Sequence, residues 1–248
     1  DGERLWSLDG DGIDARRAGR PLPRAASLAN LGLLAAQLPP GADFPGNGFR
    51  ERYLRGRGWE PGALPPARWE AAVRRARGQR RRKLLKKTLR ECSAFVCRRS
   101  WRRFAVWDRR YDSAGLRALA ADPAAFCRQG RMLKEGNTSS VYRVTVAGLD
   151  LAVKQYHIKN RLHAWRQSLR RGRARRSWLN AHRLVMAGIA TPPPVLLVEE
   201  RWGLRRSTAW FVTEYVAGAN VYARLRSPEA HRVDLPSLAR QFRELFLR

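Results

Sequence analysis

The segment from residue 132 to residue 154 constrains the fold most, because apolar and polar residues alternate in it around a turn of small side chains. The alternation predicts a strand, a turn at Gly136, a returning strand that ends near Val146, and an apolar strand at residues 151–153. Lys154 follows directly, 18 residues after Gly136. That separation is about the length of two strands and a turn, so we expect the lysine ammonium to reach back to the turn.

The turn has the composition of a loop that binds phosphate groups. Its small and hydroxyl side chains are those of Gly136, Asn137, Thr138, Ser139 and Ser140. Such side chains let backbone N–H groups and hydroxyls approach a triphosphate, while Val141 would pack over an adenine ring and Lys154 would bind the phosphates. The alternative is an ordinary hairpin beside a surface lysine, because a loop with a single glycine is a weak motif.

Hydrophobic periodicity in the rest of the chain predicts a mainly helical first part and a mixed second part, which indicates an α+β protein. Helices are expected at residues 27–38, 49–54, 67–90, 113–119, 123–128 and 173–187. Strands are expected in a hairpin that turns near residues 98–103, and at residues 195–199 and 209–214. Helical spacing resumes at residue 221 and again at residue 235.

The chain is strongly basic, with a formal net charge of +29 over 248 residues. Its 44% of hydrophobic residues and nine tryptophans can still bury a core, which excludes wholesale disorder. Residues 68–110 carry seventeen lysines and arginines against three acidic residues. This excess predicts a polyanionic partner, either nucleic acid, an anionic membrane face or a phosphorylated substrate. The alternative is a solvated basic face. The three cysteines have no zinc-site spacing.

Four segments together carry a family resemblance: residues 135–144, 151–156, 176–184 and 213–218. At these segments the chain resembles the lipopolysaccharide kinase family, whose members phosphorylate heptose or Kdo sugars of the lipopolysaccharide inner core in Gram-negative bacteria. The resemblance extends over about residues 132–225. It implies the small lobe of a protein-kinase-like fold, with a basic helix, and it implies ATP and Mg²⁺ as cofactors.

The resemblance also implies roles for individual residues. The nucleotide-binding residues would be Gly136, Asn137, Thr138, Ser139, Ser140, Val141, Lys154, Glu214 and Val216. Lys154 would be the catalytic residue that clamps the α- and β-phosphates. The segment from Glu214 to Val216 would be the hinge whose backbone bonds adenine. In protein kinases a helix glutamate pairs with this lysine, yet residues 155–198 contain no Asp or Glu. Glu135, Glu199 or an acid outside the chain would have to replace it.

The first part of the chain also resembles this family. Residues 5–12 look like the strand and metal-binding turn that follow a catalytic loop, with Asp9 at the metal-ligand position. Residues 27–38 and 49–54 resemble large-lobe helices. These resemblances imply the large-lobe portion of one kinase-like unit, with Asp9, at residues 1–91. The small lobe and the start of the large lobe of the next unit would follow at residues 92–248. We therefore expect a partial chain that lacks the catalytic loop and is inactive alone.

Three functions follow as hypotheses. The first is an ATP-dependent sugar kinase of lipopolysaccharide core biosynthesis. The second is a kinase-like pseudoenzyme or scaffold that binds anionic lipid or a partner enzyme. The third is a nucleic-acid-binding protein, which the lack of zinc-finger spacing and of an aromatic-rich RNA-binding motif disfavours. The expected partner is the lipopolysaccharide core or another anionic glycolipid, with an anionic membrane surface as a further one. The expected location is cytoplasmic, including a peripheral position at the inner face of the inner membrane.

Overall fold

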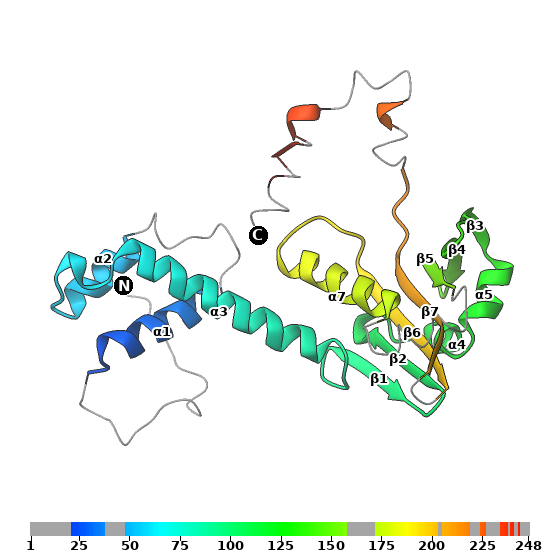
Figure 1. Cartoon of the computed structure of the whole chain (residues 1–248), viewed down its shortest axis with the longest axis horizontal. Helices are drawn as coiled ribbons and strands as arrows, with labels where there is room; N and C mark the ends of the chain where they lie inside the picture. Colours follow the sequence, from blue (N-terminus) through cyan, green and yellow to red (C-terminus); the bar gives the residue numbers. More distant parts are fainter. Residues whose placement is uncertain are drawn as a thin grey trace. The chain divides into compact units, whose positions relative to one another are not determined.

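The computed structural model describes residues 21–37, 48–157, 172–202, 205–218, 224–226, 234–237, 239–240 and 243. The chain divides into two compact units, Asp1–Gly78 and Gln79–Arg248. Helices and a seven-stranded antiparallel sheet confirm the predicted α+β class (Figure 1). Among the described helices, none combines the length and the apolar character that a membrane span requires. Asp9 and the predicted strand at residues 5–8 lie outside the described residues.

The first unit is helical. Its elements are α1 (Arg24–Ala35), α2 (Phe49–Gly56), the 3₁₀ turn η3 (Pro61–Ala63) and the first part of α3 (Pro66–Lys87). They enclose a small core of Leu31, Ala35, Leu54, Leu64 and Trp69. Gly32 lets α1 approach α3 closely, because a Cβ there would lie 3.1 Å from the backbone of Ala72. The helices predicted at residues 27–38, 49–54 and 67–90 are thereby confirmed.

The second unit is built on one sheet with the strand order β1-β2-β6-β7-β5-β4-β3. The strands are β1 (Phe95–Arg99), β2 (Arg103–Asp108), β3 (Arg131–Lys134), β4 (Ser139–Val146), β5 (Leu149–Tyr156), β6 (Pro194–Trp202) and β7 (Arg205–Glu214). The helical elements are η4 (Arg109–Tyr111), α4 (Ala114–Ala121), α5 (Pro123–Gln129) and α7 (Arg173–Met186). The predicted hairpin near residues 98–103 is confirmed, as are the strands around the Gly136 turn.

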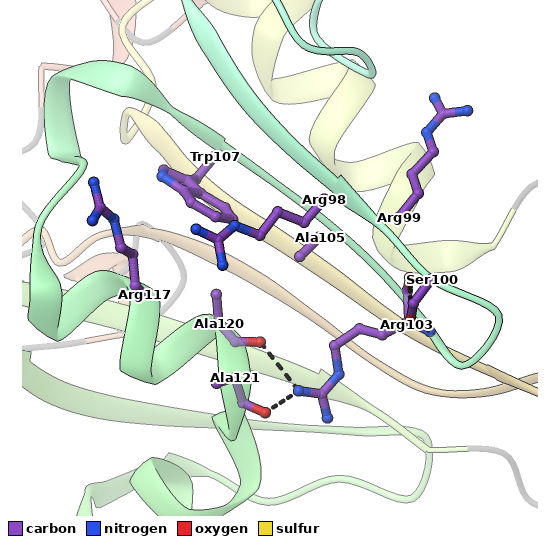
Figure 2. A pocket seen from close by; sticks show the side chains of 9 residues that line it. All are labelled: Arg98, Arg99, Ser100, Arg103, Ala105, Trp107, Arg117, Ala120 and Ala121. Atoms are coloured by element: carbon purple, nitrogen blue, oxygen red, sulfur yellow. Dashed lines mark hydrogen bonds between the residues drawn. The ribbon is translucent and has the colours of Figure 1, made fainter.

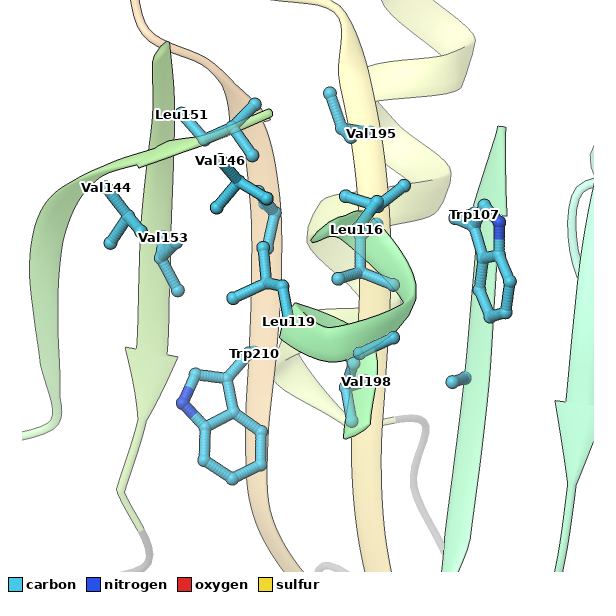
Figure 3. Packing of buried hydrophobic residues seen from close by; sticks show 14 of the residues in the cluster. Trp107, Leu116, Leu119, Val144, Val146, Leu151, Val153, Val195, Val198 and Trp210 are labelled. Atoms are coloured by element: carbon cyan, nitrogen blue, oxygen red, sulfur yellow. The ribbon is translucent and has the colours of Figure 1, made fainter. Parts of the chain in front are cut away.

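Helices cover both faces of this sheet. On one face, α4 and α5 enclose the larger core, in which Leu116 and Leu119 pack with Trp107, Val153 and Trp210 (Figure 3). On the other face, α7 packs its Trp178 with a second set of buried residues. That set includes Phe104, Val106, Tyr156 and Leu197. Strands β2, β5 and β6 therefore bury side chains on both faces, which explains the apolar runs in β5 and β6.

The register of the sheet fixes which side chains share the α7 face. Val106 lies opposite Leu197, Leu197 opposite Phe211, Phe211 opposite Lys154, and Lys154 opposite Val141. Directly opposed residues in an antiparallel pair project to the same face. Lys154 and Val141 are therefore on the face of the sheet that α7 covers.

His182 makes this second core sensitive to acid. The ring is 6% exposed, its centroid lies 4.3 Å from that of Trp178, and burial lowers the pKa of His182 to about 4. Asp108 raises this pKa and Arg110 lowers it, both less strongly than burial. Because the unfolded chain binds a proton near pH 6.5 and the folded chain does not, stability falls as pH drops from about 6.5 to about 4.

The expected loss over that window is up to about 3 kcal/mol in the free energy of unfolding. Urea unfolding of the wild type and of His182→Phe at pH 7 and pH 4.5 measures it. The phenylalanine variant should lose less stability on acidification than the wild type. Equal losses in the two proteins would show that His182 is not the group responsible.

Candidate functional site

The predicted phosphate loop and Lys154 are brought together by the pairing of β4 with β5. Gly136, Asn137 and Thr138 connect β3 to β4, and we call residues 136–140 the hydroxyl loop. Val141, which follows the loop, is directly opposite Lys154. The register thus places the lysine at the end of the sheet where the loop begins, on the α7 face. A Cβ on Gly136 would lie 3.0 Å from the Ser139 carbonyl oxygen, so the turn has little room for a larger residue.

Two side chains from outside the hydroxyl loop hold its conformation. The buried Ser140 hydroxyl lies 3.1 Å from His157 Nε2, and the His157 N–H donates to the Thr138 carbonyl at 3.2 Å. Arg173, the first residue of α7, donates from Nη2 to Thr138 Oγ1 at 3.2 Å and from Nη1 to the Thr138 carbonyl at 3.4 Å. The loop is therefore tied both to the end of β5 and to the beginning of α7.

The ring of Tyr156 lies close to two cations. Lys154 Nζ is 5.3 Å from the ring centroid, and Arg173 Cζ is 5.2 Å from it. The Tyr156 hydroxyl is 2.7 Å from Ser177 Oγ on α7, which orients the ring. This arrangement holds the lysine ammonium and the guanidinium at the same end of the sheet as the hydroxyl loop. The start of α7 adds a partial positive charge there.

Lys154 has no acidic partner among the described residues. Ser177 on α7, which the family resemblance places near the position of the kinase helix glutamate, contacts Tyr156 instead. Glu199, one of the expected partners, is 1% exposed and accepts from Arg175 at 2.7 Å and from Arg201 at 2.9 Å. Glu199 is therefore engaged with two arginines and is not the partner of Lys154. Glu135, the other expected partner in the chain, is exposed and forms no ion pair within the described part.

The predicted hinge follows β7 directly. Glu214 pairs with Leu151, three residues before Lys154 on β5, which places it about 10 Å from Lys154 along the strand. The Glu214 N–H donates to the Pro193 carbonyl at 3.0 Å, and its carboxylate accepts from the Tyr111 hydroxyl. Burial, and then the bond to Glu214, raises the pKa of Tyr111 to about 12. The side chain of Glu214 is therefore occupied within the fold.

The next two hinge residues differ in their backbone contacts. The Tyr215 N–H donates to the Asp150 carbonyl at 2.8 Å, and Arg143 Cζ lies 4.4 Å from the Tyr215 ring centroid. Arg143 also donates to the Asp150 carboxylate and lowers its pKa. Val216 is 63% exposed, and its backbone forms no hydrogen bond to any described residue. Its N–H and carbonyl groups are the ones that this hinge leaves available to a ligand.

The described residues do not form a metal-binding site. No group of three or more His, Cys, Asp or Glu side chains comes together in the described part of the chain. The predicted ligand Asp9 lies outside it. A magnesium ion in a phosphoryl-transfer site is commonly held by one or two carboxylates together with substrate phosphates. We therefore assign no metal ligand and derive no chemical step through a metal.

Comparison with known proteins gives one further observation. Residues 124–246 match the model of the Lipopolysaccharide kinase (Kdo/WaaP) family. The chain belongs to this family over those residues. Searches of curated proteins and of solved structures gave no match. Membership of the lipopolysaccharide kinase family confirms the resemblance inferred from sequence and the kinase-like class of the fold. Such kinases use ATP and a divalent metal in general.

The lipopolysaccharide kinase match includes the hydroxyl loop, Lys154, α7 and the hinge. The roles of the individual site residues stay predictions. Residues 1–123 lie outside the match, so the large-lobe helices and the domain boundary after residue 91 also stay predictions. The division at Gly78 reflects compactness and does not test which kinase lobe each part represents.

Three residues of the site were not predicted from the sequence: Tyr156, His157 and Arg173. Arg173 lies 35 positions from Thr138, and nothing in local periodicity pairs the two. His157 follows β5 directly, so its return to the loop could have been inferred from the hairpin register. Tyr156 lies two positions after Lys154 in the same strand and therefore on the same face. This two-residue spacing is the sequence feature from which the position of Tyr156 beside Lys154 could have been predicted.

Proposed function

We propose that this chain binds ATP along the α7 face of the sheet, between the hydroxyl loop and the hinge. The observation that carries the proposal is the direct pairing of Lys154 with Val141, the residue that follows the hydroxyl loop. In this reading, backbone N–H groups of the loop cover the phosphates and Lys154 binds the α- and β-phosphates. Val141 covers the adenine ring and the backbone of Val216 bonds to it.

Arg173 extends this site. Its guanidinium binds Thr138 and, like Lys154 Nζ, lies close to the Tyr156 ring, so two cations lie near the proposed phosphate position. A triphosphate carries several negative charges, and charge-assisted hydrogen bonds to arginine are among the stronger polar contacts. We infer that Arg173 both orders the hydroxyl loop and adds positive charge for the phosphates.

The reaction we propose is transfer of the γ-phosphoryl group of ATP to a heptose or Kdo hydroxyl of the lipopolysaccharide core. Family membership supports a lipopolysaccharide kinase in general, and the finer choice of acceptor is our proposal. The protein would contribute positioning and electrostatic stabilisation, which dominate phosphoryl transfer. When bound, Mg²⁺ would neutralise charge on the phosphates. Asp9, the metal ligand that the sequence predicts, belongs to the preceding kinase-like unit and is not assigned to this site.

A second candidate is a nucleotide-binding pseudoenzyme. It is favoured by one observation, the missing acidic partner of Lys154 among the described residues. The position on α7 that would hold a glutamate in a protein kinase faces Tyr156 through a serine hydroxyl instead. This candidate shares the nucleotide site and differs only in the absence of phosphoryl transfer.

Thermal shift with ATP, with and without Mg²⁺, tests the nucleotide site. ATP should raise the unfolding temperature, because a ligand that binds only the folded state stabilises it. Absence of any shift with either ATP condition would contradict the proposal. Radiolabelled phosphate transfer to a heptose- or Kdo-containing core oligosaccharide then separates the kinase from the pseudoenzyme.

Replacing Arg173 with glutamine should weaken ATP binding by roughly tenfold, as expected when one charge-assisted contact to phosphate is lost. Binding of adenosine, which has no phosphates, should change much less. Arg176→Gln is the matched control, since Arg176 is exposed on the same helix. Calorimetric titration of ATP and adenosine into the three proteins measures this difference. Equal weakening by both substitutions would assign the effect to net charge.

A further inference from the structure

A second feature lies on the opposite face of the sheet from Lys154. A cavity of about 180 Å³ opens beside the β1–β2 hairpin and the end of α4. Arginines 98, 99, 103 and 117 line it together with small side chains and Trp107. In Figure 2, Arg98 and Arg117 lie near Trp107, whereas Arg99 extends away from them. Arg99 donates to the Leu89 carbonyl at 2.7 Å, so its charge is directed elsewhere.

Two of the remaining arginines are compensated by neighbours. Arg103 donates to the last carbonyls of α4 and lies 3.3 Å from Glu200. Arg117 forms a two-pronged pair with Asp112, at 2.9 and 2.8 Å, which lowers the pKa of Asp112 to about 2. Asp112 therefore stays ionised at neutral pH. These pairs fix the positions of both guanidiniums at the rim of the cavity.

Arg98 is different, because no carboxylate pairs with it among the described residues. It is exposed, and its Cζ lies 5.7 Å from the centroid of the buried Trp107 ring. Cation–π contact of this kind orients a guanidinium without neutralising its charge. The cavity thus has one oriented, uncompensated cation with two further guanidiniums beside it. That is the chemistry of a site for an oxyanion such as a phosphate group.

The tip of the same hairpin adds an independent observation. Trp101 is 73% exposed, which is unusual for a large aromatic side chain, and it is flanked in sequence by two arginines on each side. Tryptophan beside basic residues is typical of segments that lie at the interface between water and an anionic membrane. Arg98 lies in β1, and Trp101 lies three residues later, in the turn between β1 and β2.

We propose that the β1–β2 hairpin docks on an anionic membrane surface, with a lipid phosphate in the arginine cavity and Trp101 at headgroup depth. At about 180 Å³ the cavity is smaller than the ~300 Å³ lower bound of most small-molecule sites, which suits a headgroup phosphate better than a whole ligand. Trp101 favours a lipid over a free phosphate ester as the source. This site lies on the α4 face and does not depend on the proposed ATP site.

Co-sedimentation tests the site, using vesicles of phosphatidylcholine with and without phosphatidic acid at near-physiological salt. Arg98→Gln and Trp101→Ser should each weaken binding to the acidic vesicles by about tenfold. The double variant should weaken it further. Arg128→Gln is the charge-matched control, because Arg128 is exposed on α5, outside the cavity. It should bind like the wild type. Because Trp101 is exposed and Arg98 has no carboxylate partner in the described part, neither substitution should unfold the protein. Unfolding temperatures equal to that of the wild type verify this.

Each other outcome has a defined meaning. Equal losses of vesicle binding in Arg98→Gln and Arg128→Gln would show that diffuse charge attraction causes the binding. That result would overturn the proposal. Binding of soluble glycerol 3-phosphate that depends on Arg98, without vesicle binding, would overturn the lipid source. Stronger binding to duplex DNA than to acidic vesicles would overturn membrane docking. A Lys154→Met variant should keep vesicle binding. A failure of the proposed ATP site can therefore be distinguished from a failure of the membrane site.

Discussion

Replacing Lys154 with methionine is expected to abolish the rise in unfolding temperature that ATP produces. Methionine keeps much of the aliphatic length of lysine and removes only the ammonium. That ammonium lies over Tyr156 and beside the hydroxyl loop, with no acidic partner in the described part of the chain, so the phosphates would be its main counter-charge. Losing a charge-assisted contact of this kind should weaken ATP binding by roughly 10- to 100-fold.

Lys86→Met is the matched control for this experiment. Lys86 is exposed in the last turn of α3, so the variant removes the same charge away from the hydroxyl loop. It should show the wild-type ATP shift. If Lys154→Met also keeps the full shift, the lysine does not bind the nucleotide and the proposed site is wrong. Adenosine binding provides a second check, since it should survive in both variants.

Glu199→Ala is expected to cause the largest loss of stability among these substitutions. The carboxylate is almost fully buried and is shared by Arg175 of α7 and Arg201 of β6, at 2.7 and 2.9 Å. Both guanidiniums also lie over the Phe104 ring, with Cζ at 4.7 and 5.0 Å from its centroid. Removing the shared carboxylate takes a buried acceptor away from two mostly covered guanidiniums, which costs about 3–5 kcal/mol.

Glu200→Ala offers a control in the adjacent position of the same strand. Glu200 pairs with Arg103 at 3.3 Å and its side chain is 35% exposed, so its loss should cost at most about 1 kcal/mol. Urea unfolding of the wild type and both variants measures the difference. Similar small losses in the two variants would mean that the buried pair contributes little.

The Glu199 cluster also connects stability to the proposed site. Arg175 anchors the beginning of α7 to β6, and Arg173 two residues earlier binds the hydroxyl loop. Loosening this anchor should therefore weaken ATP binding as well as stability. In the double variant Glu199→Leu with Arg175→Met, a well-packed apolar pair should recover part of the stability. Recovery of stability without recovery of ATP binding would show that Arg175 is needed to place α7.

Much of the fold could be predicted from periodicity. Alternation around Gly136 indicated two strands, and the apolar run before Lys154 indicated a third, because side chains in a strand alternate between faces. The same reasoning placed Lys154 near the hydroxyl loop, which the pairing of Val141 with Lys154 confirmed. The family resemblance rested on these local patterns too, and the match over residues 124–246 bears it out.

The partners of the charged residues could not be predicted in the same way. Glu199 was an expected partner of Lys154, but it lies on β6, two strands away from β5, and binds Arg175 and Arg201. Arg173 was only one of nine basic residues in an acid-free segment until α7 placed it against Thr138. The choice among equivalent cations depends on packing between distant segments.

By itself, then, the sequence determined the α+β class and the three strands around the hydroxyl loop. These properties depend on repeating local patterns and on short turns. Only the tertiary structure decided that Tyr156 lies close to two cations, that Glu199 binds two arginines, and that Arg98 lies beside a cavity with no carboxylate partner among the described residues. Such contacts join residues far apart in the chain, and their geometry is set by which helix packs on which face of the sheet.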